Sequence, residues 1–507
     1  MALALLSAIA LMVPVWNAGP VTIDEHGSYW IIDADTSGGV WSRCLNVAAT
    51  PPLFSWVQQA CLAGGGKSAG MLRFPGVLGY LLAVLTTYIV GRMLDGPRVG
   101  GLAALVLAWH PVVVDEVRIG RCYGLLLWLC AVLLGTTLWW RRNPTSLLRA
   151  AVWSLSAAAV FWTHYLGAPL IAMSWLTVLW PRPTSDLRGQ SFIAAILGGI
   201  VVAVACLPLA PAVERLAEWG PFLNYQTGTT SVANLLGPFW WLGLPLAIGV
   251  ASLLPRIVAF RSPKEASFRG AKGDYRWTTA PIWMPVLWSL APIVLLSAVS
   301  HGSHSSLANP RYRVPYAVGG ACLFAMAVPS RRHPRIAIAG VTLALVATWA
   351  ATDIRPWELR RLSDLGATDW QRIAEAIESD GQAGEPVFVQ SGLVESNLVP
   401  VFCRDEPFLE YVACRASRFY LPTPHPRIGL PFLWDKGDVA ECFRQRIATE
   451  SANGRRVIWV ACATDSDLCR ASAAGIQQLL AEARYVPTKH ETYPTAILQR
   501  WERPSAR

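Results

Sequence analysis

Long apolar runs separated by short polar loops fill the first 352 residues of the chain. Most runs approach the ~20 residues that a helix needs to cross a hydrocarbon core of ~30 Å. The first run is alternatively a signal peptide, and the fifth and sixth are short enough to be miscounted. The pattern predicts eleven membrane-spanning helices, at about residues 2–18, 72–91, 99–114, 122–140, 147–163, 165–180, 191–210, 236–255, 281–299, 313–329 and 336–352.

The pattern changes near residue 352, beyond which short helical and strand signals alternate as in a small soluble α/β domain. The predicted elements there are a helix at 370–379 capped by Asp369, buried strands at 386–390 and 456–461, a helix at about 467–484 and a terminal hairpin within 484–498. No glycine fingerprint or P-loop follows either strand, which disfavours nucleotide binding. We therefore predict a transmembrane domain at 1–352 and an α/β domain at 353–507.

Charge supports this division. Residues 1–352 carry 36 charged side chains, whereas residues 353–507 carry 40 in less than half the length. Sixteen of the 24 Lys and Arg residues of the helical part fall in loops that an eleven-helix topology places on one side, and such an excess marks the cytoplasmic face. We therefore expect a multi-pass plasma- or inner-membrane protein, with a cytoplasmic N-terminus and an extracytoplasmic C-terminal domain. The net charge of +10 reflects this topology and gives little support for nucleic-acid binding.

Eleven cysteines leave at least one unpaired. Outside the cytoplasm, Cys403–Cys414 and Cys462–Cys469 are plausible disulfides, although spacing does not fix the connectivity. No His joins these cysteines at zinc-ligand intervals. We expect no metal site and no required cofactor, and the sequence gives no support for a divalent metal.

Ionisable residues are scarce in the predicted spans and gather in the outer loops, which favours chemistry at the outer membrane surface. The long first outer loop, about 17–71, begins with Asp24 and Glu25, although Asp24 alternatively only caps a helix. Two later outer loops add further acids, bases and aromatic residues: Asp115, Glu116, Arg118, Arg121 and Tyr123 in one, and His304, Arg311, Tyr312 and Arg313 in the other. Tyr312 alternatively belongs to an interfacial belt. Several arginines beside histidine suit a phosphate group.

The order of these motifs resembles a known family. Asp24-Glu25-x-x-x-Tyr29 opens the loop, Pro51-Pro52-Leu53 follows, Arg73-Phe74-Pro75 enters the second span, and Arg118-x-x-Arg121-x-Tyr123 enters the fourth. This order is similar to that of the GT-C superfamily of polyprenyl-phosphate-sugar glycosyltransferases, above all the protein mannosyltransferases and the lipid A aminoarabinose transferases. The resemblance covers the first ~140 residues well and the rest more loosely.

The resemblance implies a helical membrane body with an outer catalytic cavity and an inverting sugar transfer. Asp24 would act as general base, and Glu25 would position Asp24 or the acceptor. The donor phosphate would meet Arg118, Arg121, Arg311 and Arg313, with His304 and Arg73 behind them and Asp115, Glu116, Tyr123 and Tyr312 as further candidates. The partners would be a polyprenyl-phosphate sugar and a lipid, protein or glycan acceptor.

Two positions depart from the family pattern. Thr50 stands where several relatives have Lys before Pro-Pro-Leu, and Cys122 stands where Pro is common. Three alternatives follow for the missing lysine: Lys67 substitutes for it, an arginine does, or the donor binds differently. Two other classes stay open. A transporter or flippase predicts polar residues along a path at the membrane midplane, and a non-catalytic scaffold or receptor predicts that replacing Asp24 has no effect on activity.

Overall fold

The computed structural model describes the chain in segments that form two compact units. The described residues are 1–16, 19–36, 38–179, 188–218, 283–303, 310–328, 334–350, 365–392, 405–421, 424–434 and 438–504. Unit 1 comprises residues 1–15, 74–208 and 227–358, and unit 2 comprises residues 16–73, 209–226 and 359–507. The segment predicted as the first outer loop therefore belongs to the same unit as the C-terminal domain. The structure defines the geometry within each unit only.

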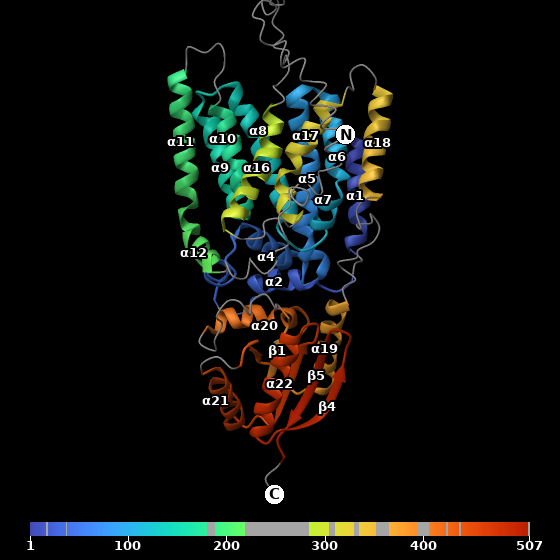
Figure 1. Cartoon of the computed structure of the whole chain (residues 1–507), viewed down its shortest axis with the longest axis vertical. Coiled ribbons are helices and arrows are strands. Elements are labelled where there is room, and N and C mark those ends of the chain that lie inside the picture. The colour runs from blue at the N-terminus through green and yellow to red at the C-terminus, as the bar shows by residue number, and fades with distance from the viewer. Residues whose placement is uncertain are drawn as a thin grey trace, which may run out of the picture. The chain divides into compact units, whose positions relative to one another are not determined.

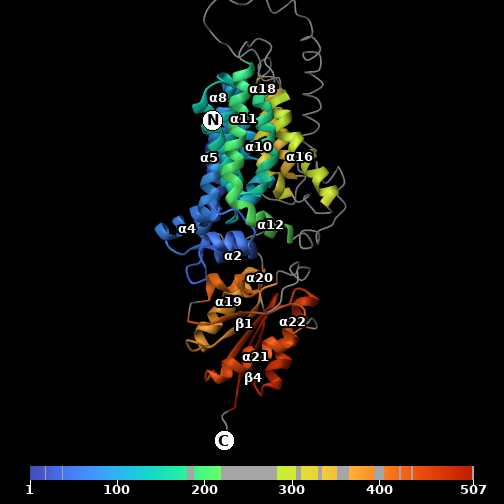
Figure 2. The same ribbon diagram turned by 90° about the vertical axis from the view of Figure 1, so that its left-hand side faces the viewer.

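Unit 1 is built of helices, and Figure 2 shows α10, α11 and α16 lying lengthwise beside one another. Its helices are α1 (Ala2–Trp16), most of α5 (Ala69–Asp95), α6 (Pro97–Ala108), α7 (Pro111–Val117), α8 (Tyr123–Arg142), α9 (Leu147–Thr163), η2 (Tyr165–Gly167), α10 (Ala168–Leu179), α11 (Arg188–Cys206), η3 (Leu207–Leu209, at the edge of the unit), α16 (Trp283–Ser303), η5 (Pro310–Tyr316), α17 (Ala317–Ala327) and α18 (Pro334–Ala350).

Three helices among the described residues are long and apolar enough to cross a membrane: α5, α8 and the continuous stretch Ser191–Glu218. The pair α6 and α7 passes the same test as one span with a bend of 59°. Shorter apolar helices cover four more of the predicted spans: Ala2–Val15, Leu147–Thr163, Tyr165–Leu179 and Trp283–Leu296. The predicted span at 236–255 lies outside the described residues. The structure thus supports a mostly helical body, and the count of eleven stays a prediction.

Glycines allow α5 and α8 to approach closely at the start of α8. A methyl group on Gly124 would lie 1.9 Å from the carbonyl oxygen of Gly76, and one on Gly79 would lie 2.5 Å from the backbone of Gly124. Small residues at such crossings let helix backbones touch in membrane proteins. The segment before α8 lies against the same part of α5: a methyl group on Gly76 would be 3.3–3.5 Å from the carbonyl oxygens of Val117, Ile119 and Arg121.

Unit 2 combines residues 16–73, which include the predicted first outer loop, with the α/β domain (Figure 1). The loop contributes α2 (Ile23–Ile32), α3 (Val40–Ser42), the π-helical turn η1 (Arg43–Val47) and α4 (Leu53–Gly65), and α12 (Ala210–Glu218) comes from mid-chain. The C-terminal part contributes α19 (Leu365–Asp380), β1 (Val387–Gln390), α20 (Glu406–Tyr420), β2 (Arg427–Gly429), α21 (Val439–Ala452), β3 (Val457–Ala463), α22 (Asp467–Glu482), β4 (Val486–Thr492) and β5 (Ala496–Glu502).

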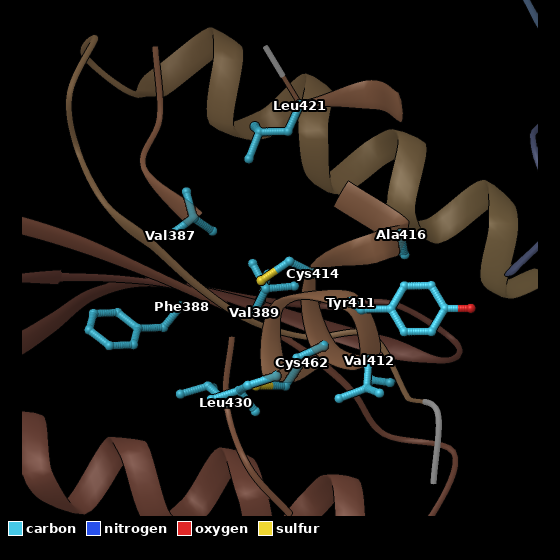
Figure 3. Packing of buried hydrophobic residues seen from close by; sticks show 14 of the residues in the cluster. Val387, Phe388, Val389, Tyr411, Val412, Cys414, Ala416, Leu421, Leu430 and Cys462 are labelled. Atoms are coloured by element: carbon cyan, nitrogen blue, oxygen red, sulfur yellow. The ribbon is translucent and has the colours of Figure 1, made fainter. Parts of the chain in front are cut away.

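The five strands form one mixed sheet in the order β2-β1-β3-β5-β4. Strand β1 pairs in parallel with β2 and β3, whereas β5 pairs antiparallel with β3 and with β4. Side chains of β1 alternate between the two faces. Figure 3 shows Val389 beside Cys414 of α20, while Phe388 points away and its ring approaches Phe443 of α21 at 6.4 Å. The predicted strands, the helix at 467–484 and the terminal hairpin are all present, with ends shifted by a few residues.

Two expectations for this domain are wrong. Asp369 does not cap a helix, because α19 already begins at Leu365; its buried carboxylate accepts hydrogen bonds from the backbone N–H and the hydroxyl of Thr495, both at 2.8 Å. Cys462 and Cys469 are free thiols, and so is Cys414, whose expected partner Cys403 lies outside the described residues.

Candidate active site

Helix α2 carries the predicted catalytic acids in its first turn. Thr22 and Glu25 form a capping box: the Thr22 hydroxyl accepts from the Glu25 N–H at 3.3 Å, and the Glu25 carboxylate accepts from the Thr22 N–H at 2.8 Å. Such a box satisfies backbone donors that the first turn leaves open. Asp24 sits in the same turn and is half-buried. The helix N-terminus favours negative charge at this position.

Glu25 and Arg73 form a buried ion pair. The Arg73 guanidinium donates to both carboxylate oxygens of Glu25, at 2.7 and 2.9 Å, and Nη2 also donates to the Pro20 carbonyl at 3.1 Å. Both residues have no exposed surface. The start of α5 is thereby bonded to the start of α2, and Asp24 lies next to the bonded residue. These contacts give Glu25 and Arg73 a clear part in positioning Asp24; their roles toward substrate stay predictions.

The face of α2 formed by His26, Tyr29 and Trp30 packs against α20. Trp30 meets Tyr411 edge-on at 5.0 Å between ring centroids, and Tyr29 meets Phe419 at the same distance. The backbone N–H of Val21 donates to the Tyr420 hydroxyl at 2.5 Å. The helix with the predicted base is therefore held by a segment almost 400 residues later in the chain.

A network around Asp33 continues this contact at the end of α2. Its carboxylate accepts from the Tyr29 hydroxyl at 3.2 Å and the Thr36 hydroxyl at 3.0 Å, and it pairs with Arg418 at 3.7 Å. Arg43 donates to the backbone carbonyls of Asp33 and Trp30. Burial lowers the pKa of Arg418 to about 10, with the nearby Arg427 guanidinium as the next cause. Positive charge is thus concentrated where α20 meets the first outer loop.

Two side chains that the sequence did not single out lie at the contact between α2 and α20. His26 has no exposed surface, and neither ring nitrogen has a hydrogen-bond partner in the described part of the chain. Burial, together with the positive charges of Arg415 and Lys67, lowers the pKa of His26 from 6.5 to about 3. Arg415 of α20 lies next to α2: a methyl group on Gly27 would be 3.4 Å from its Nη1 atom.

Unit 1 gathers a second set of predicted residues. Arg118, at the end of α7, donates to the Leu11 carbonyl of α1 at 3.0 Å. Tyr123 stacks on His164, with ring centroids 6.0 Å apart. The positive charges of Arg121 and Arg311 are near enough to act electrostatically on the His164 ring. Glu116 acts electrostatically on Tyr123, together with these two arginines. His164 ends α9, so the fold adds this histidine to the predicted group.

The remaining candidates divide as follows. Arg313 is buried in η5, whereas Tyr312 and Asp115 are half-buried. His304 lies outside the described residues. Asp24, Glu25 and Arg73 belong to unit 2, and Asp115, Glu116, Arg118, Arg121, Tyr123, Arg311, Tyr312 and Arg313 belong to unit 1. Among the described residues, no group of three His, Cys, Asp or Glu side chains could hold a metal ion; that none is required stays a prediction.

No family model and no curated protein sequence matches the chain. Solved structures do. The chain is similar to ArnT from Cupriavidus metallidurans in the apo state, with a TM-score of 0.59 and 15% identity over 98% of this chain and 97% of that one. ArnT bound to undecaprenyl phosphate gives a TM-score of 0.57, 14% identity and the same coverage. Arabinofuranosyltransferase AftD from Mycobacteria gives 0.51 and 15% identity over 99% of this chain and 41% of that one.

These likenesses show the fold. The chain has the fold of ArnT over nearly the whole length of both proteins, in agreement with the helical fold that the order of the motifs implied. At 14–15% identity the likeness concerns the fold and does not extend to substrates or catalytic residues.

Proposed function

We propose that this chain is a membrane glycosyltransferase that moves a sugar from a polyprenyl-phosphate donor to an acceptor at the outer membrane face. The observation that supports it most is the fold shared with ArnT, combined with an acidic first turn of α2 directly after the first apolar helix. One of the similar ArnT structures is bound to undecaprenyl phosphate, and a lipid phosphate of that kind suits the arginines of unit 1.

Asp24 acts as the general base. Its carboxylate takes the proton of the acceptor hydroxyl while that oxygen attacks the anomeric carbon of the sugar. The bond from the anomeric carbon to the phosphate oxygen breaks, and polyprenyl phosphate leaves as an anion. A single displacement with one carboxylate base inverts the anomeric configuration. Glu25 and Arg73 hold the first turn of α2, and with it Asp24, in place.

The donor phosphate needs cations more than it needs an acid, because it leaves already ionised. Arg121 and Arg311 suit this role, since both act on the ring of His164 and both are half-exposed. Arg118 and Arg313 are more deeply buried. Arg313 shares η5 with Arg311, and Arg118 ends α7 three residues before Arg121. Arg offers forked donors that match phosphate oxygens. His304 remains a further candidate.

The test follows release of polyprenyl phosphate from a polyprenyl-phosphate sugar by the full-length protein in lipid. Asp24→Asn is expected to lower turnover by about 10²–10⁴-fold. Asp467→Asn is the matched control, because that carboxylate is 98% exposed and paired with Arg470. Equal turnover by wild type and Asp24→Asn would refute the assignment of the base.

One observation favours a second function. The pair α6 and α7 is bent by 59°, and broken helices can form ion or substrate sites in transporters. A transport function predicts movement of lipid-linked sugar across vesicles without release of polyprenyl phosphate. Release of polyprenyl phosphate that depends on Asp24, without movement of lipid-linked sugar across the vesicle membrane, would exclude the transport function.

A further inference from the structure

The facing surfaces of α2 and α20 contain three buried hydrogen-bond donor groups without partners. They are the Arg415 guanidinium Nε, the Trp30 indole Nε1 and the imidazole ring of His26, all unpaired in the described part of the chain. Arg415 is 5% exposed, Trp30 1% and His26 0%. Buried polar groups almost always have partners, and a buried charge without one is costly. Three such groups on one interface are a strong sign of a ligand.

Their arrangement is regular. His26 and Trp30 are four residues apart on α2, and Tyr411 and Arg415 are four residues apart on α20, so each pair lies on one helix face. Trp30 packs on Tyr411 at 5.0 Å between centroids, and Arg415 packs over Gly27, which has no side chain to displace it. The three donors therefore line the same seam between the two helices.

The charge balance of this seam selects an anion over a water molecule. Arg415 carries a positive charge and forms no ion pair with any residue that the structure describes, whereas the neighbouring Arg418 pairs with Asp33 and Glu410. The exposed Lys67 adds a second cation, with its ammonium 5.0 Å from the Tyr29 ring centroid and 5.3 Å from that of Phe419. A bridging water would satisfy donors but would leave the guanidinium charge uncompensated.

We propose that the α2–α20 seam is an oxyanion site that takes a phosphate or carboxylate group carried by the acceptor substrate. Arg415 and Trp30 donate to the oxyanion, the neutral His26 ring donates its one N–H, and Lys67 attracts the anion at the exposed edge. The assignment to the acceptor rests on the proposed function, in which the donor phosphate is served by arginines of unit 1. The site lies on the helix that holds Asp24, so it would bind the acceptor through α2 itself.

The test measures thermal unfolding of the purified full-length protein with inorganic phosphate, with glucose 1-phosphate as a sugar-borne phosphate, and with sodium chloride at equal ionic strength. Both phosphates are expected to raise the midpoint of wild type, since a ligand of the folded state stabilises it, and chloride is not. Arg415→Met should weaken phosphate binding by about 10–100-fold, and Trp30→Phe by about tenfold. Arg444→Met is the control, because Arg444 is half-exposed and already paired with Glu441 and Glu482.

A second readout separates a ligand site from a structural role. Without phosphate, Arg415→Met should unfold no earlier than wild type, because it removes an uncompensated buried charge. Because the proposed donor arginines of unit 1 could also respond to phosphate, wild type and Arg415→Met are compared in a background that carries Arg121→Ala. A phosphate response retained after Arg415→Met in that background, or matched by chloride, would overturn the site. A response to inorganic phosphate but none to glucose 1-phosphate would overturn its assignment to the acceptor. The assay contains no sugar donor, and phosphate should raise the unfolding midpoint of Asp24→Asn as much as that of wild type. Loss of the proposed oxyanion site can therefore be told apart from failure of the proposed sugar transfer.

Discussion

The ion pair between Glu25 and Arg73 offers the sharpest test of how the candidate base is held. We consider Arg73→Met, Glu25→Gln and the double variant. Glutamine keeps a carbonyl oxygen that can accept from the Thr22 N–H, so the helix cap can persist while the charge is lost. Each single variant leaves one buried charge without its partner, whereas the double variant removes both charges.

The expected magnitudes follow from burial. Breaking a buried ion pair from one side costs about 3–5 kcal/mol, and replacing both partners by neutral groups costs far less. For a unit of this size, each kcal/mol shifts the unfolding midpoint by about 2–4 °C. Each single variant should therefore unfold roughly 6–20 °C earlier than wild type, and the double variant should recover most of that shift.

The assay is thermal unfolding of the purified full-length protein in lipid, together with turnover at a temperature where every variant is folded. Because Glu25 and Arg73 position Asp24 through α2, the two single variants should lose similar amounts of turnover. Additive losses of stability in the double variant would refute the ion-pair reasoning. A double variant that regains stability but stays as inactive as Glu25→Gln would instead show that the Glu25 carboxylate acts on the substrate.

Three further predictions concern other groups. Burial lowers the pKa of His26 from 6.5 to about 3 in the folded protein, so between pH 3 and pH 6.5 the unfolded chain binds more protons than the folded one. The free energy of unfolding should therefore fall by about 2 kcal/mol from pH 7 to pH 5. In denaturant titrations, His26→Phe should lose this dependence of the unfolding free energy on pH. Asp369→Ala should destabilise unit 2 by about 1.5–3 kcal/mol in the same titrations, because two donors of Thr495 lose their acceptor, and an unchanged midpoint would contradict this. Arg118→Ala or Arg121→Ala should raise KM for the donor more than for the acceptor in steady-state kinetics, and a purely acceptor-side effect would argue against phosphate binding.

Features governed by local pattern were predictable from the sequence. The predicted spans at 122–140 and 147–163 agree closely with α8 and α9, since an apolar run between charged flanks defines a membrane helix by itself. The strands at 386–390 and 456–461 were found for a similar reason, because buried parallel strands are short continuous apolar runs.

Features that depend on long-range contacts were not predictable. Asp369 fits the local signal of a helix cap, but its carboxylate is bound by Thr495, a contact that no nearby residue indicates. Arg415 lies in an amphipathic helix of the C-terminal domain, where an arginine is ordinarily on the surface. The pairing of α20 with α2 places it over Gly27, the residue after His26. His26 directly follows Asp24 and Glu25 in the sequence, and this position was the one local indication that it belongs near the predicted site.

The hydrogen bond from Val21 to Tyr420 joins residues 399 positions apart, and this has a consequence for biosynthesis. Chains are made from the N-terminus, and contacts between distant residues form late. Helix α2 would therefore leave the ribosome long before α20 is synthesised. Its aromatic face could pack against α20 only after most of the protein has been translated and inserted. A chain truncated before residue 405 would retain Asp24 yet never acquire the support that orients it, so a premature stop late in the reading frame should abolish activity as completely as an early one.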